Sequence, residues 1–172
     1  YSVATDNVGH RQPTPPAAQA TTEVVNSDIL TQSATADGFT ALTVNYEIVA
    51  GPVGAFEIGI YSSTDTAPGS DTLLDTILID AAGDLTTGVH TKSFTIGGAA
   101  GEVALPGAGA TENDADYHIL VIADYLNVVA EDDADAFNED NTVVFVGAYH
   151  LATGDVFVHS GPANDTITVS GS

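Results

Sequence analysis

The chain has 172 residues, of which 24 are acidic and only Arg11 and Lys92 are basic, so its formal net charge is -22. Nucleic acid and anionic membrane surfaces would repel so acidic a protein, whereas cations are its natural counterparts. An apolar fraction of 44% allows a buried core, and the absence of Cys excludes disulfides, Cys-bound zinc and thiol catalysis.

The setting of the protein is indicated by the same composition. Counterions in a saline or calcium-rich exterior would screen the self-repulsion, so we expect an extracellular or cell-surface location. No apolar run approaches the roughly 20 residues that span a bilayer, so we expect no membrane insertion. The sequence begins at Tyr1 and contains no Met, which indicates a processed form or a piece of a longer polypeptide.

The N-terminal segment, residues 1–21, reads YSVATDNVGHRQPTPPAAQAT. Pro13, Pro15 and Pro16 favour an extended, polyproline-like conformation between small and polar flanks. We therefore predict an arm or linker outside the core. We expect its own domain or a neighbouring chain to hold it, with the three prolines as subunit contacts.

From residue 22 onward the pattern is that of short β-strands separated by turns. The stretch Phe39–Ala50 alternates, with Leu42, Val44, Tyr46 and Ile48 on one face. The most apolar stretch, Asp116–Tyr125, is expected at the centre of a sheet. Further strands are predicted at 21–32, 54–63, 71–80 and 89–98, in both Val-rich arms of NVVAEDDADAFNEDNTVVFVG (127–147), in DVFVHS and in DTITVSG.

No segment shows a convincing helical period, and the strands recur at regular spacing. This pattern predicts an all-β protein, an immunoglobulin-like antiparallel β-sandwich over residues 22–150. A C-terminal strand pair would follow at 151–172, and it could be exchanged with a neighbouring subunit.

Three patches carry a resemblance to a known family: FEIGIYSSTDTAPGSDTLLDT, DYHILVIADYLNVVAE and NEDNTVVFV. They are similar to strands of the CARDB module, the cell-adhesion-related domain of exported bacterial and archaeal proteins. The resemblance covers about three-quarters of the chain, and DDADAF is an insertion in the family pattern. It implies an immunoglobulin-like sandwich that serves as a non-catalytic spacer or adhesion unit, often repeated.

The C-terminal stretch carries a second, shorter resemblance. NDTITVSG looks like one rung of the calcium-binding β-roll of secreted RTX proteins, although the full repeat is absent. A final edge strand is the other interpretation. Asn164 begins a formal N-glycosylation sequon.

Catalytic patterns are missing from the sequence. The histidines His10, His90, His118, His150 and His159 are scattered, without zinc-binding spacing. Acids crowded on one loop do not provide the separated acid and base that catalysis needs. We therefore expect that the protein is not an enzyme.

A calcium site is the sharper interpretation of the crowded acids, because Ca²⁺ prefers several carboxylate, amide and carbonyl oxygens. A solvated acidic loop is the alternative. The sequence does not determine which end of the sandwich the second acidic loop occupies. The candidate ligands are Asp124, Asn127, Glu131, Asn138 and Asp140 around the insertion, with Asp65 and Asp71 on the second loop.

The terminal segments predict how copies would associate. DTITVSG alternates, with Ile167 and Val169 on one side as subunit contacts, and the arm is extended. Together they suggest that one subunit completes its neighbour's sheet, and head-to-tail contacts of this kind build filaments. We expect a repeating subunit of a surface filament, helped by divalent cations. The alternative is a calcium-binding spacer domain of a large RTX-like adhesin.

Overall fold

The computed structural model describes residues 8–11, 26–106, 118–131 and 139–159, and the fold of this part is all-β. Two 3-10 turns, η1 (Ala82–Asp84) and η2 (Glu139–Asn141), are its only helical elements, and no described helix is long and apolar enough to cross a membrane. The strands are β1 (Asp28–Asp37), β2 (Ala41–Val49), β3 (Phe56–Ser63), β4 (Thr72–Ile79), β5 (Gly88–Thr95), β6 (His118–Ile122), β7 (Thr142–His150) and β8 (Val156–His159).

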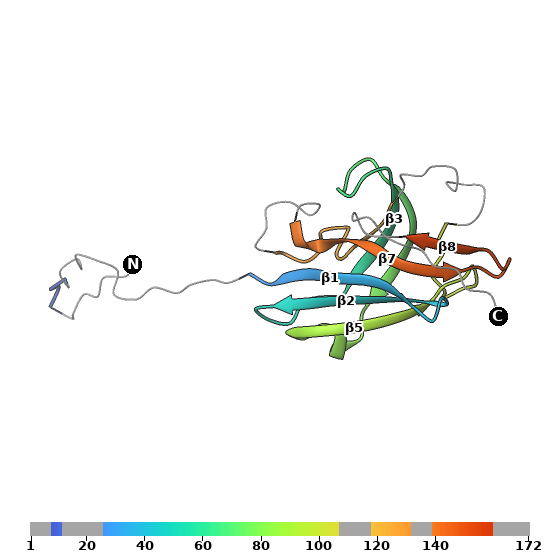
Figure 1. The fold of residues 1–172 in the computed structure, drawn as a ribbon. Coiled ribbons are helices and arrows are strands. Elements are labelled where there is room, and N and C mark those ends of the chain that lie inside the picture. The colour runs from blue at the N-terminus through green and yellow to red at the C-terminus, as the bar shows by residue number, and fades with distance from the viewer. Residues whose placement is uncertain (1–7, 12–25, 107–117, 132–138, 160–172) are drawn as a thin grey trace.

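The strands form two layers that are joined through β7. In one layer β2 lies between β1 and β5, and in the other the order is β4, β3, β6 and β7. Strand β7 first pairs with β6, then runs parallel to β1 through the pairs Ala34–Phe145 and Thr35–Val146, and finally pairs with β8. Figure 1 shows β1, β2, β5 and β7 side by side, with β3 crossing them.

This connectivity is that of an immunoglobulin-like sandwich. The chain changes layer between β2 and β3, between β4 and β5, and between β5 and β6. The predicted fold class is therefore confirmed, with the parallel β1–β7 pair as one departure from a purely antiparallel arrangement. The predicted arm is described only at residues 8–11, so Pro13, Pro15 and Pro16 lie outside the described residues.

The core lies between the two layers and follows the two-residue period of the strands. Every second residue of β2 from Leu42 to Ile48 is fully buried, and so are Ile58 and Ile60 of β3. The rings of Tyr46 and Phe56 meet edge to face across the core, with their centroids 5.6 Å apart. Strand β6 lies between β3 and β7, as its apolar sequence predicted.

One predicted strand is wrong. Residues 127–130, in the first Val-rich arm, form a loop and not a strand. The next residue, Glu131, makes an isolated bridge with Ser27. The backbone N–H groups of Val128 and Val129 bond to the Asp124 carboxylate and not to a neighbouring strand. The second arm, TVVFV, does form a strand and begins β7.

The predicted C-terminal strand pair is described in its first half only. DVFVHS gives β8, which pairs antiparallel with β7 of its own chain. The sequon at Asn164 and the contacts predicted for Ile167 and Val169 lie outside the described residues.

Candidate functional site

The predicted calcium ligands that the structure describes lie at two opposite ends of β6. Asp124 lies two residues after Ile122, the last residue of β6, whereas Asp65 lies beyond Ser63, which pairs with His118 at the first residue of β6. At about 3.3 Å per residue, the length of this strand separates the two ends by roughly 15 Å. The loop that carries Asp65 and Asp71 therefore makes no common site with Asp124.

Asp65 and Asp71 both stabilise the loop between β3 and β4. Oδ1 of Asp65 accepts a hydrogen bond from the N–H of Ala67 at 2.8 Å, and Oδ2 of Asp71 accepts one from Gly69 at 2.7 Å. Asp65 accepts from the residue two positions further on, as Asp commonly does in turns, and Asp71 accepts from the residue two positions back. Local loop structure accounts for both carboxylates.

Asp124 is a fully buried carboxylate at the end of β6. Its Oδ1 accepts a hydrogen bond from Val128 N–H at 3.1 Å and its Oδ2 accepts one from Val129 N–H at 2.7 Å. Burial raises the pKa of Asp124, while the two backbone hydrogen bonds act in the opposite direction. Both oxygens are thus used to shape the loop, in which Asn127 has a positive φ of 51°.

A second buried polar residue, Asn141, joins three segments at the same end of the sandwich. Its side-chain Nδ2 donates to Oε2 of Glu131 at 2.7 Å. Its backbone carbonyl accepts hydrogen bonds from Thr31 Oγ1 at 2.7 Å and from Ala123 N–H at 2.9 Å. Of the predicted ligands around the insertion that the structure describes, Glu131 takes part in this cluster and Asp140 is exposed, while Asn138 lies outside the described residues.

Asn141 was not among the ligands predicted from the sequence. The only sequence feature that could have indicated its role is its position directly before the apolar strand TVVFV. Its partner Thr31 lies 110 residues away in the sequence. Within the described ranges, no three His, Asp or Glu side chains are grouped as metal ligands would be. A cation at this end would therefore need amide or carbonyl oxygens beside the carboxylates.

The edge strand β8 is docked on β7 through alternate side chains. Phe157 stacks on Tyr149 at a centroid distance of 5.3 Å, and His159 stacks on the same ring at 5.7 Å. Burial, reinforced by His118, lowers the pKa of His159 to about 4, so the ring is neutral at pH 7. Val156 and Val158 point the other way and are 60% and 46% exposed.

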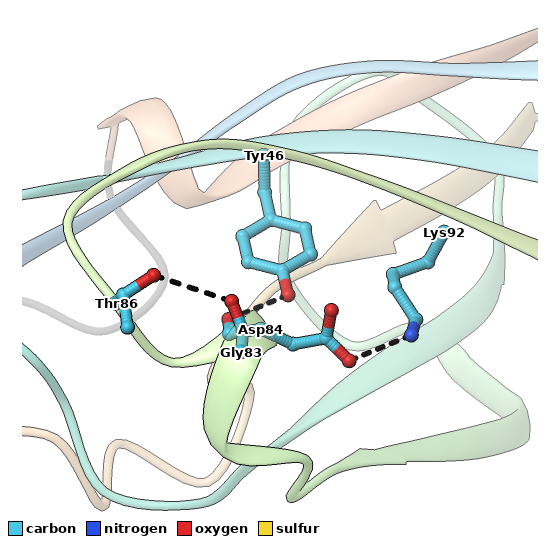
Figure 2. A network of polar contacts seen from close by, with 5 residues as sticks. All are labelled: Tyr46, Gly83, Asp84, Thr86 and Lys92. Atoms are coloured by element: carbon cyan, nitrogen blue, oxygen red, sulfur yellow. Dashed lines mark hydrogen bonds and ion pairs between the residues drawn. The ribbon is translucent and has the colours of Figure 1, made fainter.

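The only Lys of the chain serves a structural contact on the opposite layer, as Figure 2 shows. Lys92 Nζ on β5 lies 2.7 Å from Asp84 Oδ2 in η1. The Tyr46 hydroxyl donates to the backbone carbonyl of Asp84 at 2.8 Å, and burial raises the pKa of Tyr46. These contacts hold the 3-10 turn against β2 and β5.

Together, the described residues define an immunoglobulin-like sandwich with polar loops at one end and a short, ring-anchored edge strand. No family model, curated protein or solved structure matches the chain.

Proposed function

We propose that this chain is a non-enzymatic, extracellular structural or adhesion protein, the repeating subunit of a surface filament. Copies would be joined by β-strand complementation and helped by divalent cations. The observation that carries the proposal is the docking of β8, whose alternate rings enter a site made by Tyr149 and Phe145. Strand complementation uses this same combination of main-chain pairing and alternate side-chain pockets.

Exchange of β8 between copies would keep every one of these contacts. The strand has only four residues, and the turn at 151–155 is all that connects it to β7. A β8 released from its own chain could pair with β7 of a neighbour in the same register, from Gly147–His159 to His150–Val156. Exchange of an identical element is a low-cost route to association, and repeated head-to-tail exchange gives a filament.

The charge distribution also supports association at β7 and β8. A net charge of -22 opposes the approach of any two copies. Residues 141–154 and 156–164 contain no Asp or Glu, so repulsion is weaker at this edge than elsewhere. Salt and divalent cations would screen the electrostatic repulsion that remains between copies. The resemblance to the CARDB module, whose members serve as adhesion or spacer units, favours the same role.

A pair of engineered cysteines tests the exchange directly, because the chain has no Cys of its own. Ala148 and Val158 are register partners on β7 and β8, so Ala148→Cys with Val158→Cys can form a cross-strand disulfide. If β8 is exchanged, oxidation of assembled protein links successive copies, and a denaturing gel without reductant shows a ladder. Thr43→Cys with Ser93→Cys, partners on β2 and β5, is the matched control.

The control pair should link only within one chain. Electron microscopy of the same samples, in molar NaCl with millimolar CaCl₂, should show fibres that the reductant leaves intact. A disulfide found only within single chains, together with dispersed monomers, would overturn the filament. It would favour the alternative of a spacer domain in a large secreted adhesin.

A further inference from the structure

The side chain of Asn141 has a buried oxygen that the described protein atoms do not satisfy. Asn141 is fully buried, and its Oδ1 has no hydrogen-bond partner within the described ranges. The same holds for the buried Oγ1 of the next residue, Thr142. Leaving such an acceptor unsatisfied destabilises the folded state, so a bound species at this position would stabilise the fold.

The surroundings of this oxygen select a positive species. Because Asn141 Nδ2 donates to Glu131 Oε2 at 2.7 Å, its Oδ1 is held within a few ångströms of a carboxylate. The bridge between Ser27 and Glu131 brings Asp28 to the same corner. No Lys or Arg occurs between Asn127 and Gly147, and Lys92 is paired with Asp84. Amide and carboxylate oxygens in a negative field suit a hard cation.

The amide is also held in place before any ligand arrives. The Asn141 carbonyl is fixed by Thr31 of β1 and by Ala123 after β6. The hydrogen bond from Asn141 Nδ2 to Glu131 fixes the orientation of the amide, so Oδ1 keeps one direction. Asp124, by contrast, uses both carboxylate oxygens on backbone N–H groups.

We propose that Asn141 Oδ1 and the Glu131 carboxylate bind one calcium-class divalent cation, with water completing the coordination shell and Asp28 adding negative charge. The cation would tie together the start of β1, the loop after β6 and the turn before β7. With few charged ligands, affinity falls in the millimolar range typical of extracellular modules, about 10⁻⁴–10⁻³ M. The inference rests on the proposed function in one respect, because it assigns a binding site to the divalent cations that the proposed function invokes.

The test compares full-length wild type with Glu131→Gln by calorimetric titration and thermal unfolding. In wild type, 10 mM CaCl₂ should raise Tm by several degrees above NaCl of equal ionic strength, because the cation binds the folded state alone. Glu131→Gln keeps an acceptor for Asn141 and should weaken calcium binding at least tenfold. Asp71→Asn makes the same charge change at the opposite end and should bind calcium as wild type does.

A second variant keeps the test informative if Glu131→Gln fails to fold. Asn141→Asp retains the oxygen and adds a charge beside Glu131, so it should lower Tm without calcium and tighten calcium binding. The inference is overturned if wild type shows no calcium-specific shift, or if Glu131→Gln and Asp71→Asn lose equal affinity. A buried water would then account for the Asn141 oxygen. The cysteine ladder is scored separately, so loss of calcium binding with a retained ladder leaves the filament proposal standing.

Discussion

The carboxylate of Asp124 accepts a 2.7 Å hydrogen bond from the backbone N–H of Val129, five residues further along the chain. Its other oxygen accepts from Val128, so one side chain satisfies two backbone donors that a neighbouring strand would otherwise have to pair. Asp124 itself has a positive φ of 45°, which most residues adopt at some cost and Asp tolerates well.

Replacing Asp124 should therefore destabilise the whole domain. Asp124→Ala leaves two N–H groups unsatisfied beside the core, one of them on the buried Val129, and should lower the free energy of unfolding by about 2–4 kcal/mol. Urea denaturation measures the loss. Asp140→Ala removes an exposed carboxylate nearby and should stay within about 0.5 kcal/mol of wild type. Equal losses in the two variants would contradict the role assigned to Asp124.

At Gly147 the backbone of β7 comes close to that of β1. A Cβ at this position would lie 2.9 Å from the backbone N of Ala36, and Gly147 has a φ of 156°. Gly147→Ala should therefore cost about 1–3 kcal/mol through backbone displacement. Gly54→Ala is the matched control, because a Cβ there meets nothing within 4 Å. A Gly147→Ala protein with an unchanged urea midpoint would show that the two strands can separate freely.

The contacts in Figure 2 predict unequal effects for two substitutions. Tyr46→Phe leaves the Asp84 carbonyl without its buried donor and should cost about 1–2 kcal/mol. Lys92→Met breaks an ion pair whose side chains are 30% and 23% exposed, so its effect should remain below about 1 kcal/mol and shrink in high salt. Chemical denaturation at low and high NaCl would separate them, and a larger loss for Lys92→Met would reverse this ranking.

His159 should make β8 sensitive to mild acid. Its pKa is about 4 in the folded protein and 6.5 when unfolded, so between these values the unfolded chain binds more protons. Stability is therefore full above pH 6.5 and falls as the pH drops towards 4, by an amount on the order of 2 kcal/mol after allowance for solvent screening. Urea unfolding across this range, with NMR titration of the ring, measures the effect.

A His159→Phe variant isolates this contribution from the titration of the many carboxylates. The Phe ring can stack on Tyr149 but cannot take up a proton, so the acid-dependent difference between the variant and wild type reports His159 alone. If both proteins lose stability in parallel between pH 6.5 and 4, the ring does not carry the effect.

The sequence was informative wherever a strand alternates between core and solvent. Leu42, Val44 and Ile48 on β2 were identifiable by the two-residue period alone, and all three are buried. Strand β1 continues to Asp37, beyond its predicted end at residue 32. The prediction ended too early because a register shift between Thr31 and Ser33 interrupts the alternation of the strand. The period therefore disappears from the sequence at the point where the strand continues.

The polar end was harder to predict for a different reason. Val-rich composition favours a strand at Val128 and Val129, but the Asp124 side chain offers their N–H groups a closer partner. Asn141 becomes significant only when Thr31, Ala123 and Glu131 converge on it, and a single sequence carries no record of that convergence. The calcium site was predicted from the crowding of carboxylates on one loop, whereas the buried cluster around Asn141 contains fewer charged side chains.

The parallel pair of β1 and β7 gives the domain a direction in which it resists force. Tension applied between Asp28, where β1 begins, and His150, where β7 ends, would pull two parallel strands past one another. The hydrogen bonds around Ala34–Phe145 and Thr35–Val146 would then be loaded together in shear, whereas separation of β5 from β2 from one end breaks bonds in turn. Single-molecule pulling between Asp28 and His150 should therefore give a higher rupture force than pulling that separates β5 from β2 from one end.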